Sequence, residues 1–189
     1  MPTKSNRDNG DVAVAEKRFS LVDPDRVISM IPLRPYHNVA DIGCRSGYFS
    51  VPLAKYVSQG KLYAMDTNKE MLDICREHLS AVHLSNVEVL QCGEKKLPLD
   101  EGSLDGAFVA FTLNEAKNKK SFLAEAGRLL EKGGWLAVLE WYKAEMDEGP
   151  PLKQRVSAEE AKGFGEEAGL RFVSQRDLNG KNYLMLFRK

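Results

Sequence analysis

One stretch near the front of the chain, 38–49, limits the folds open to this sequence more than any other. Its letters, NVADIGCRSGYF, run from an apolar segment through an acid into a glycine-containing turn and then into an amphipathic segment. This order is typical of a strand, a tight turn and a helix that together form a nucleotide-type site. Gly43 and Gly47 allow the backbone to turn sharply and to approach a ligand where a Cβ would collide. The free N–H groups of the following helix face the same crevice.

Strand and helix patterns alternate along the rest of the chain. Apolar or alternating runs predict strands at 38–42, 61–66, 87–92, 104–111 and 135–141. Helical spacing and capping residues predict helices at 24–31, 48–57, 68–79, 119–130 and 158–168. We expect Gly133-Gly134 to stop the fourth of these helices, and Ser157 with Glu160 to form a capping box before the fifth.

The end of the chain has a different pattern, because two extended runs follow one another without a helix. These runs, 170–177 and 182–188, are joined through Asn179-Gly180, a strong hairpin signal. The sequence therefore predicts an α/β fold, a doubly wound and mostly parallel seven-stranded sheet with an antiparallel C-terminal hairpin. We expect residues 1–22 to be an N-terminal tail and lead-in, and residues 23–189 to form a single domain.

The longest stretch without a pattern, 143–155, contains Gly149-Pro150-Pro151. It follows the C-terminal end of a predicted strand, where folds of this class bind ligands. A lid on the substrate side and a plain connector are both open interpretations.

Charge and cysteine content narrow the class of protein. Lys plus Arg and Asp plus Glu both number 27, so the formal net charge is zero and the sequence disfavours nucleic acid as a partner. Cys44, Cys75 and Cys92 are odd in number and lack CxxC spacing, which predicts reduced thiols in a cytoplasmic protein without a metal site. No apolar run approaches the roughly 20 residues of a membrane-spanning helix, and the polar start lacks a signal-peptide core.

Acidic residues follow two further predicted strands. Asp66 ends the second strand, about 20 residues beyond Gly47, where an acid is placed to accept hydrogen bonds from ribose hydroxyls. Its other interpretation is a cap for the helix that begins at Asn68. Gly93 and Glu94 follow the third strand, where they either border a base or form a solvated turn.

Four separated blocks of the sequence carry a family resemblance. They are the turn 41–49, the segment MDTNKEML at 65–72, the run LPLDEGSLD at 97–105 and LLEKGG at 129–134. In this order they resemble the class I S-adenosylmethionine-dependent methyltransferases, and most of all the small methyltransferase type 11 proteins. The resemblance implies a Rossmann-like methyltransferase fold with S-adenosylmethionine as the cofactor.

Carried over position by position, the resemblance also implies a cofactor site. Asp66 would hold the ribose hydroxyls, Glu94 would lie near the adenine, and Thr112 would lie at the inner edge of the cofactor. The full set of cofactor-binding residues that it implies is Asp41, Gly43, Cys44, Gly47, Asp66, Thr67, Met71, Gly93, Glu94 and Thr112.

Two positions depart from the family pattern. Arg45 occupies the middle glycine position of the first turn, where a positive φ would be costly for arginine. Its side chain would either crowd the pocket or contact the cofactor carboxylate. Gly93 lies where many relatives carry the acid that contacts adenine, which leaves Glu94 one position away.

The sulfonium cofactor is already activated, so in-line positioning and exclusion of water are the main tasks of the protein. A general base helps only where the acceptor must lose a proton. Candidates at the strand ends are Asn114, Glu115 and Glu140, although relatives often carry His at the position of Asn114 and Asn cannot act as a base. Trp141 and Tyr142 are open to two interpretations, an aromatic wall for the acceptor or core packing.

The expected function is methyl transfer to a small-molecule acceptor, by a chain compatible with a homodimer. The alternative is a catalytically weak or inactive methyltransferase-like fold that binds a nucleotide-type ligand or a protein partner. A nicotinamide dehydrogenase is a more distant alternative, because the first turn lacks Gly-x-Gly-x-x-Gly.

Overall fold

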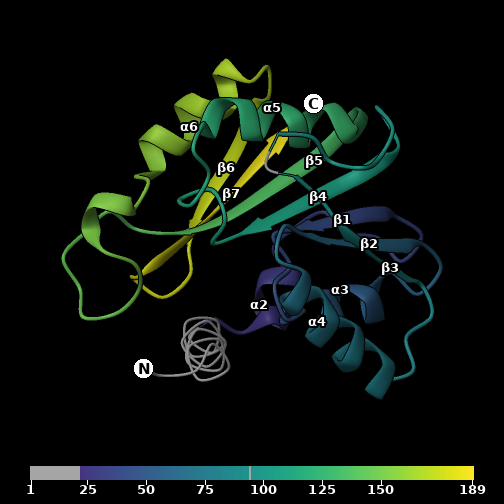
Figure 1. Ribbon diagram of the computed structural model, residues 1–189. Coiled ribbons are helices and arrows are strands. Elements are labelled where there is room, and N and C mark those ends of the chain that lie inside the picture. Colours follow the sequence, from purple (N-terminus) through teal and green to yellow (C-terminus); the bar gives the residue numbers. More distant parts are fainter. Residues whose placement is uncertain (1–21, 94) are drawn as a thin grey trace.

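A central sheet of seven strands organises the computed structural model, which describes residues 22–93 and 95–189 (Figure 1). The strands are β1 (Asn38–Ile42), β2 (Lys61–Asp66), β3 (Val87–Gln91), β4 (Leu104–Ala110), β5 (Leu130–Trp141), β6 (Arg171–Asp177) and β7 (Asn182–Arg188). Their order across the sheet is β3-β2-β1-β4-β5-β7-β6. The first five strands pair in parallel, and β7 runs antiparallel to both β5 and β6. The predicted fold class is therefore confirmed.

Helices cover both faces of this sheet. On one face lie α2 (Pro24–Ile28), α3 (Ser50–Tyr56) and α4 (Lys69–Ala81), and on the other α5 (Lys119–Leu129) and α6 (Ala158–Glu167) (Figure 1). Successive side chains of a strand point to opposite faces, so β4 supplies Phe108 to the core under α2 and α3, and Val109 to the core under α5 and α6. A short 3-10 helix, η1 (Leu152–Gln154), interrupts the segment before α6.

The helix starts follow the predicted capping chemistry. The Asp23 side chain accepts a hydrogen bond from the Asp25 N–H at the start of α2. Ser157 and Glu160 form the predicted capping box of α6, with each side chain accepting from the other residue's N–H.

Several element boundaries differ from the prediction, among them those of α2, α3 and β5. Helix α2 ends at Ile28 and α3 begins at Ser50, so both are shorter than expected. Helix α5 is not stopped by the glycine pair, because the backbone is already extended at Leu130, with ψ 141°. Gly133 and Gly134 instead lie inside β5, where they exchange backbone hydrogen bonds of 3.1 and 3.0 Å with Lys189.

The connections create a switch point between β1 and β4, and we call the region at the strand ends there the crevice. The chain leaves β1 toward α3 on one face and leaves β4 toward α5 on the other, and doubly wound folds bind ligands where neighbouring connections separate in this way. Of the predicted tail, 1–22, all but Val22 lies outside the described residues. Within the described part of the chain, none of the helices combines the length and the apolar character needed to cross a membrane.

Candidate functional site

The turn after β1 is packed tightly against two neighbouring segments. Gly43 has φ +80°, and a Cβ added there would lie 2.1 Å from Thr112 Oγ1 in the loop after β4. Gly47 has φ +88°, and its added Cβ would lie 2.8 Å from Cys75 Sγ on α4. Both glycines therefore serve the close approach of the protein's own side chains, in addition to the positive φ that other residues rarely adopt.

Arg45 connects three strand ends in this turn. Its φ is +51°, so the middle position of the turn does adopt the left-handed conformation, which is costly for arginine. Its N–H donates to Asp66 Oδ2, at the end of β2, over 2.9 Å. Its guanidinium forms an ion pair with Glu115 in the loop after β4. The turn after β1 is thus tied to the ends of both neighbouring strands.

The Asp66 carboxylate is held at the end of β2 by main-chain donors. Besides the bond from Arg45, its Oδ1 accepts from the Asn68 N–H over 2.9 Å, and the residue is 8% exposed. Asn68 itself caps α4, because its side chain accepts from the Glu70 and Met71 N–H groups. The interpretation of Asp66 as the helix cap is therefore wrong.

Asp41, at the end of β1, is a buried carboxyl. Its Oδ2 accepts a hydrogen bond of 2.6 Å from Ser50 Oγ, the first residue of α3. Burial raises the pKa of Asp41 to about 7, the Ser50 hydrogen bond opposes this rise, and the charge of Asp66 adds to it. Asp41 thus changes its charge near neutral pH while facing α3.

The three cysteines are free thiols, and Cys44 and Cys75 are buried. A hydrogen bond to Cys75, together with burial, raises the pKa of the Cys44 thiol. Cys44 therefore contributes a neutral packed side chain to the inner wall of the turn.

The remaining predicted cofactor residues are divided by the structure. Thr112 lies over Gly43, and its hydroxyl donates to the Ala110 carbonyl over 3.0 Å. Thr67 and Gly93 are exposed beyond the ends of β2 and β3, and Met71 is half-buried on α4. Glu94 lies outside the described residues. The structure brings Asp41, Gly43, Asp66 and Thr112 to one edge of the sheet, with Thr67 and Gly93 at its margin.

The two catalytic candidates are bonded to each other. Glu140, 0% exposed at β5, accepts from the Asn114 N–H over 2.9 Å and from Asn114 Nδ2 over 3.1 Å at each carboxylate oxygen. Asn114 Nδ2 also donates to the Phe111 carbonyl over 2.9 Å. Because Nδ2 faces only acceptors, the amide cannot flip without losing these bonds.

Burial raises the pKa of Glu140 to about 7, although hydrogen bonds from the Asn114 and Trp141 N–H groups lower it in part. Glu140 is fully buried and both of its carboxylate oxygens bond to Asn114, so it exposes no surface of its own to a ligand. The pair is therefore a fixed amide supported by a carboxyl that titrates near neutrality.

The aromatic residues after β4 and β5 belong to the core. Trp141 is 1% exposed and lies 5.6 Å from Phe111, measured between ring centroids. Phe111 has φ +54°, a strained conformation for a side chain of this size at the end of a strand. Tyr142 packs against Tyr183 with centroids 5.3 Å apart. For Trp141 the packing interpretation holds.

Arg155 organises the segment 143–155, a role that no sequence motif indicates. Its side chain is buried and donates to four main-chain carbonyls, at distances from 2.6 to 3.3 Å, those of Tyr142, Ala144, Glu148 and Pro150. Ser50 was also not identified from the sequence as the partner of Asp41, because their hydrogen bond depends on how α3 packs against β1. Arg155 therefore orders the segment, and this bonding fits a lid and a connector equally.

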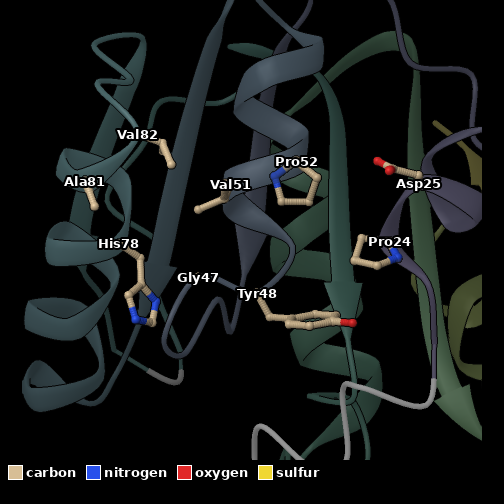
Figure 2. Close-up of a pocket in the computed structure, with 9 residues that line it drawn as sticks. All are labelled: Pro24, Asp25, Gly47, Tyr48, Val51, Pro52, His78, Ala81 and Val82. Atoms are coloured by element: carbon tan, nitrogen blue, oxygen red, sulfur yellow. The ribbon is translucent and has the colours of Figure 1, made fainter.

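A separate groove of about 370 Å³ opens between α2, α3 and α4. Figure 2 shows its apolar lining, including Pro24, Val51 and Val82, with Tyr48 and His78 on its walls. Gly47 is the only predicted cofactor residue among those that line it. The charged groups at the strand ends thus lie apart from this groove.

Residues 40–138, more than half of the chain, match the family described as "Methyltransferase domain". A ubiquinone/menaquinone biosynthesis C-methyltransferase from Marinomonas sp. is 32% identical over 122 residues, covering 64% of this chain and 49% of the relative. A demethylmenaquinone methyltransferase from Listeria monocytogenes is 29% identical over 104 residues, covering 54% of this chain and 44% of the relative. The chain thus spans about half the length of the curated relatives it matches.

Solved structures match over more of the chain. A SAM-dependent methyltransferase from Aquifex aeolicus has a TM-score of 0.86 and 32% identity, covering 90% of this chain and 92% of that one. The [4+2]-cyclase SpnF has a TM-score of 0.78 at 17% identity, covering 88% of this chain and 80% of that one, which shows the fold alone. The family resemblance stated from the sequence is confirmed.

Proposed function

The chain belongs to the S-adenosylmethionine-dependent methyltransferases, and from that premise we propose that it methylates a small-molecule acceptor held beside Asn114. The observation that carries this proposal is the fixed amide of Asn114 at the end of β4, supported from behind by buried Glu140. Asn114 Nδ2 is used within the protein, which leaves Oδ1 as the part of the amide able to accept a hydrogen bond from an acceptor molecule.

The residues at the strand ends fit the cofactor. The Asp66 carboxylate suits ribose hydroxyls, because its backbone donors fix it in place while each oxygen keeps a further lone pair. When bound, S-adenosylmethionine supplies an activated methyl group on a positively charged sulfur. The protein then has to orient the acceptor in line and exclude water.

The chemistry of the pair narrows the acceptor. Asn114 cannot remove a proton, and Glu140 is fully buried with its carboxylate bonded to Asn114. The proposed acceptor is therefore a nucleophile that needs no base from Asn114 or Glu140, such as an amine or an already ionised oxygen or carbon acid, and it offers one N–H or O–H to Asn114 Oδ1. Because the relatives' names include demethylmenaquinone, a quinol of that class is tested beside amines, and its methylation at carbon would need a base other than Asn114 or Glu140.

One observation favours a second function, a fold that binds the ligand without methyl transfer. SpnF, a [4+2]-cyclase, shares the fold, so the fold alone does not determine the reaction. Binding and turnover must therefore be measured separately.

The first experiment is calorimetric titration of the protein with S-adenosylmethionine and S-adenosylhomocysteine, followed by an acceptor screen that detects S-adenosylhomocysteine formation. We expect binding at micromolar ligand that Asp66→Ala abolishes. Asp100→Ala is the matched control, because Asp100 is exposed near the start of β4, at the opposite edge of the sheet. No heat at millimolar ligand would overturn the proposal, and binding without turnover on any acceptor would favour the second function.

A further inference from the structure

An ion pair crosses the crevice between β1 and β4, and neither of its residues belongs to the predicted cofactor set. The Arg45 guanidinium bonds to the Glu115 carboxylate from the opposite side of the crevice, 70 positions further along the chain. The Arg45 side chain is 24% exposed and that of Glu115 is 51% exposed. Neither side chain is fully buried, so both charges are open to a ligand, and a partly exposed pair of this kind contributes little to stability.

We infer that Arg45 and Glu115 together recognise the zwitterionic amino-acid end of the cofactor, an assignment that rests on the proposed function. The α-carboxylate of the cofactor bonds to the Arg45 guanidinium, and its α-ammonium bonds to Glu115. The ligand thereby inserts into the existing ion pair.

The order of groups along the sheet edge supports this assignment. Asp66 ends β2, Arg45 follows β1 and Glu115 follows β4, and these strands are successive neighbours in the sheet. Two strand spacings separate β2 from β4, roughly 10 Å. A ligand whose ribose contacts Asp66 therefore extends its amino-acid end along the edge toward Arg45 and Glu115. The direct bond from the Arg45 N–H to Asp66 fixes the two subsites relative to each other.

The charges support an exchange. An α-amino acid carries one negative and one positive group, so its insertion leaves both the arginine and the glutamate with an oppositely charged partner. Planar guanidinium binds carboxylate through two parallel hydrogen bonds, which favours Arg over Lys at this position. Breaking an ion pair usually costs free energy because it leaves a charge unpaired, and this exchange leaves neither charge unpaired.

The backbone of Arg45 supports a role in binding over a role in folding. Its φ of +51° is a conformation that glycine adopts at no steric cost. An arginine held there at a cost, in a turn beside the crevice, is the kind of strain that persists at ligand sites.

The test compares two ligands that differ only at the amino-acid end. S-adenosylhomocysteine carries the zwitterion, whereas 5′-methylthioadenosine keeps the adenosine and the sulfur but has neither charge. Dissociation constants are measured by calorimetry for the wild type, Arg45→Gln, Arg45→Lys and Glu115→Gln. Arg171→Gln is the matched control, because Arg171 is exposed on the edge strand β6. Thermal melting of each variant verifies that it folds.

We expect Arg45→Gln to weaken S-adenosylhomocysteine by about tenfold or more, the loss typical of a charged hydrogen bond, while 5′-methylthioadenosine stays within about twofold. Arg45→Lys gives an intermediate loss, and Glu115→Gln weakens the same ligand only. Equal weakening of both ligands by Arg45→Gln, or tighter binding of S-adenosylhomocysteine, would overturn the inference while leaving the proposed function intact. A wild type that binds neither ligand would overturn the proposed function as well.

Discussion

Two buried carboxyls on either side of the crevice are held in different ways. Asp41, at the end of β1, receives one hydrogen bond, from Ser50. Glu140, on β5, receives bonds from the Asn114 backbone and side chain and from the Trp141 N–H. Burial raises the pKa of each to about 7. The same raised pKa thus occurs in a carboxyl with one hydrogen bond and in a carboxyl with several.

The two sides of the crevice also differ in how far their charged and polar groups are already bonded. On the β1 side, the turn holds a strained Arg45 whose charged end is paired only with an exposed glutamate. On the β5 side, Asn114 Nδ2, the Glu140 carboxylate and the Arg155 guanidinium are bonded within the protein. The first side can exchange its partners for those of a ligand, whereas the second is a rigid support.

The largest effect expected is on the pH dependence of stability. The folded pKa values of Asp41 and Glu140 are about 7, above the values of 3.8 and 4.5 that apply without burial. Because the folded protein holds these protons more tightly than the unfolded chain, their contribution to the free energy of unfolding is fully present below about pH 4. This contribution is lost as the pH rises through 7. Each carboxyl should reduce the free energy of unfolding by about 3 kcal/mol over this range. Urea unfolding between pH 4.5 and 7.5 measures it.

Variants assign this slope to each side of the crevice. Asp41→Asn and Glu140→Gln should each flatten the pH dependence, and the double variant should flatten it most. A wild-type free energy of unfolding that rises between pH 4.5 and 7.5 would contradict both assignments.

The next effect concerns the rigid side. Arg155→Met should lower the free energy of unfolding by about 2–3 kcal/mol, because it removes the donor of four buried carbonyl bonds. Urea unfolding gives this loss, and the dissociation constant of S-adenosylhomocysteine should not change. A variant that keeps full stability would show that Arg155 does not order the segment 143–155.

A smaller effect is expected at Ser50. Ser50→Ala removes the hydroxyl donor of Asp41 and should cost about 1–2 kcal/mol at pH 8, where the carboxylate is charged, and less at pH 5. Thermal melting at both pH values measures this difference. Ser103→Ala is the control, since its hydroxyl bonds only the nearby Asp100 carbonyl on an exposed loop. Equal losses at the two pH values would argue against a charge-dependent bond.

The smallest effect should have the opposite sign. Arg45→Gly relieves the positive φ and loses only an exposed ion pair, so the ligand-free protein should gain about 1 kcal/mol. Arg45→Ala is the control, because alanine loses the ion pair and keeps the strained φ. A melting temperature that Arg45→Gly fails to raise above that of Arg45→Ala would show that the turn is not strained.

Most of the fold could be predicted because its signals are local. Alternation of apolar runs, the Ser157–Glu160 capping box and the Asn179-Gly180 turn each act within a few residues. The start of β5 was predicted at 135 and lies at Leu130, because the strand pairing of Gly133 and Gly134 depends on Lys189, far along the chain. A local glycine rule cannot detect a partner that arrives from another part of the sheet.

The site divides in the same way. The positions of Gly43, Gly47 and Asp66 could be predicted from the sequence. The two glycines lie in the turn directly after β1, and Asp66 is the last residue of β2. The pairing of Arg45 with Glu115 and the clamp made by Arg155 could not, because they depend on side-chain reach across folded elements. The sequence identified the charged groups at the strand ends without their partners.

The position of β7 has a consequence for how the protein is made. This strand lies between β5 and β6, although β6 precedes it in the chain. During synthesis on the ribosome, β5 therefore emerges with one open edge, along which residues 135–139 read WLAVL. An unpaired apolar edge of this kind is prone to pair with other chains. We expect the nascent protein to depend on chaperones until β7 has been synthesised and the sheet is filled.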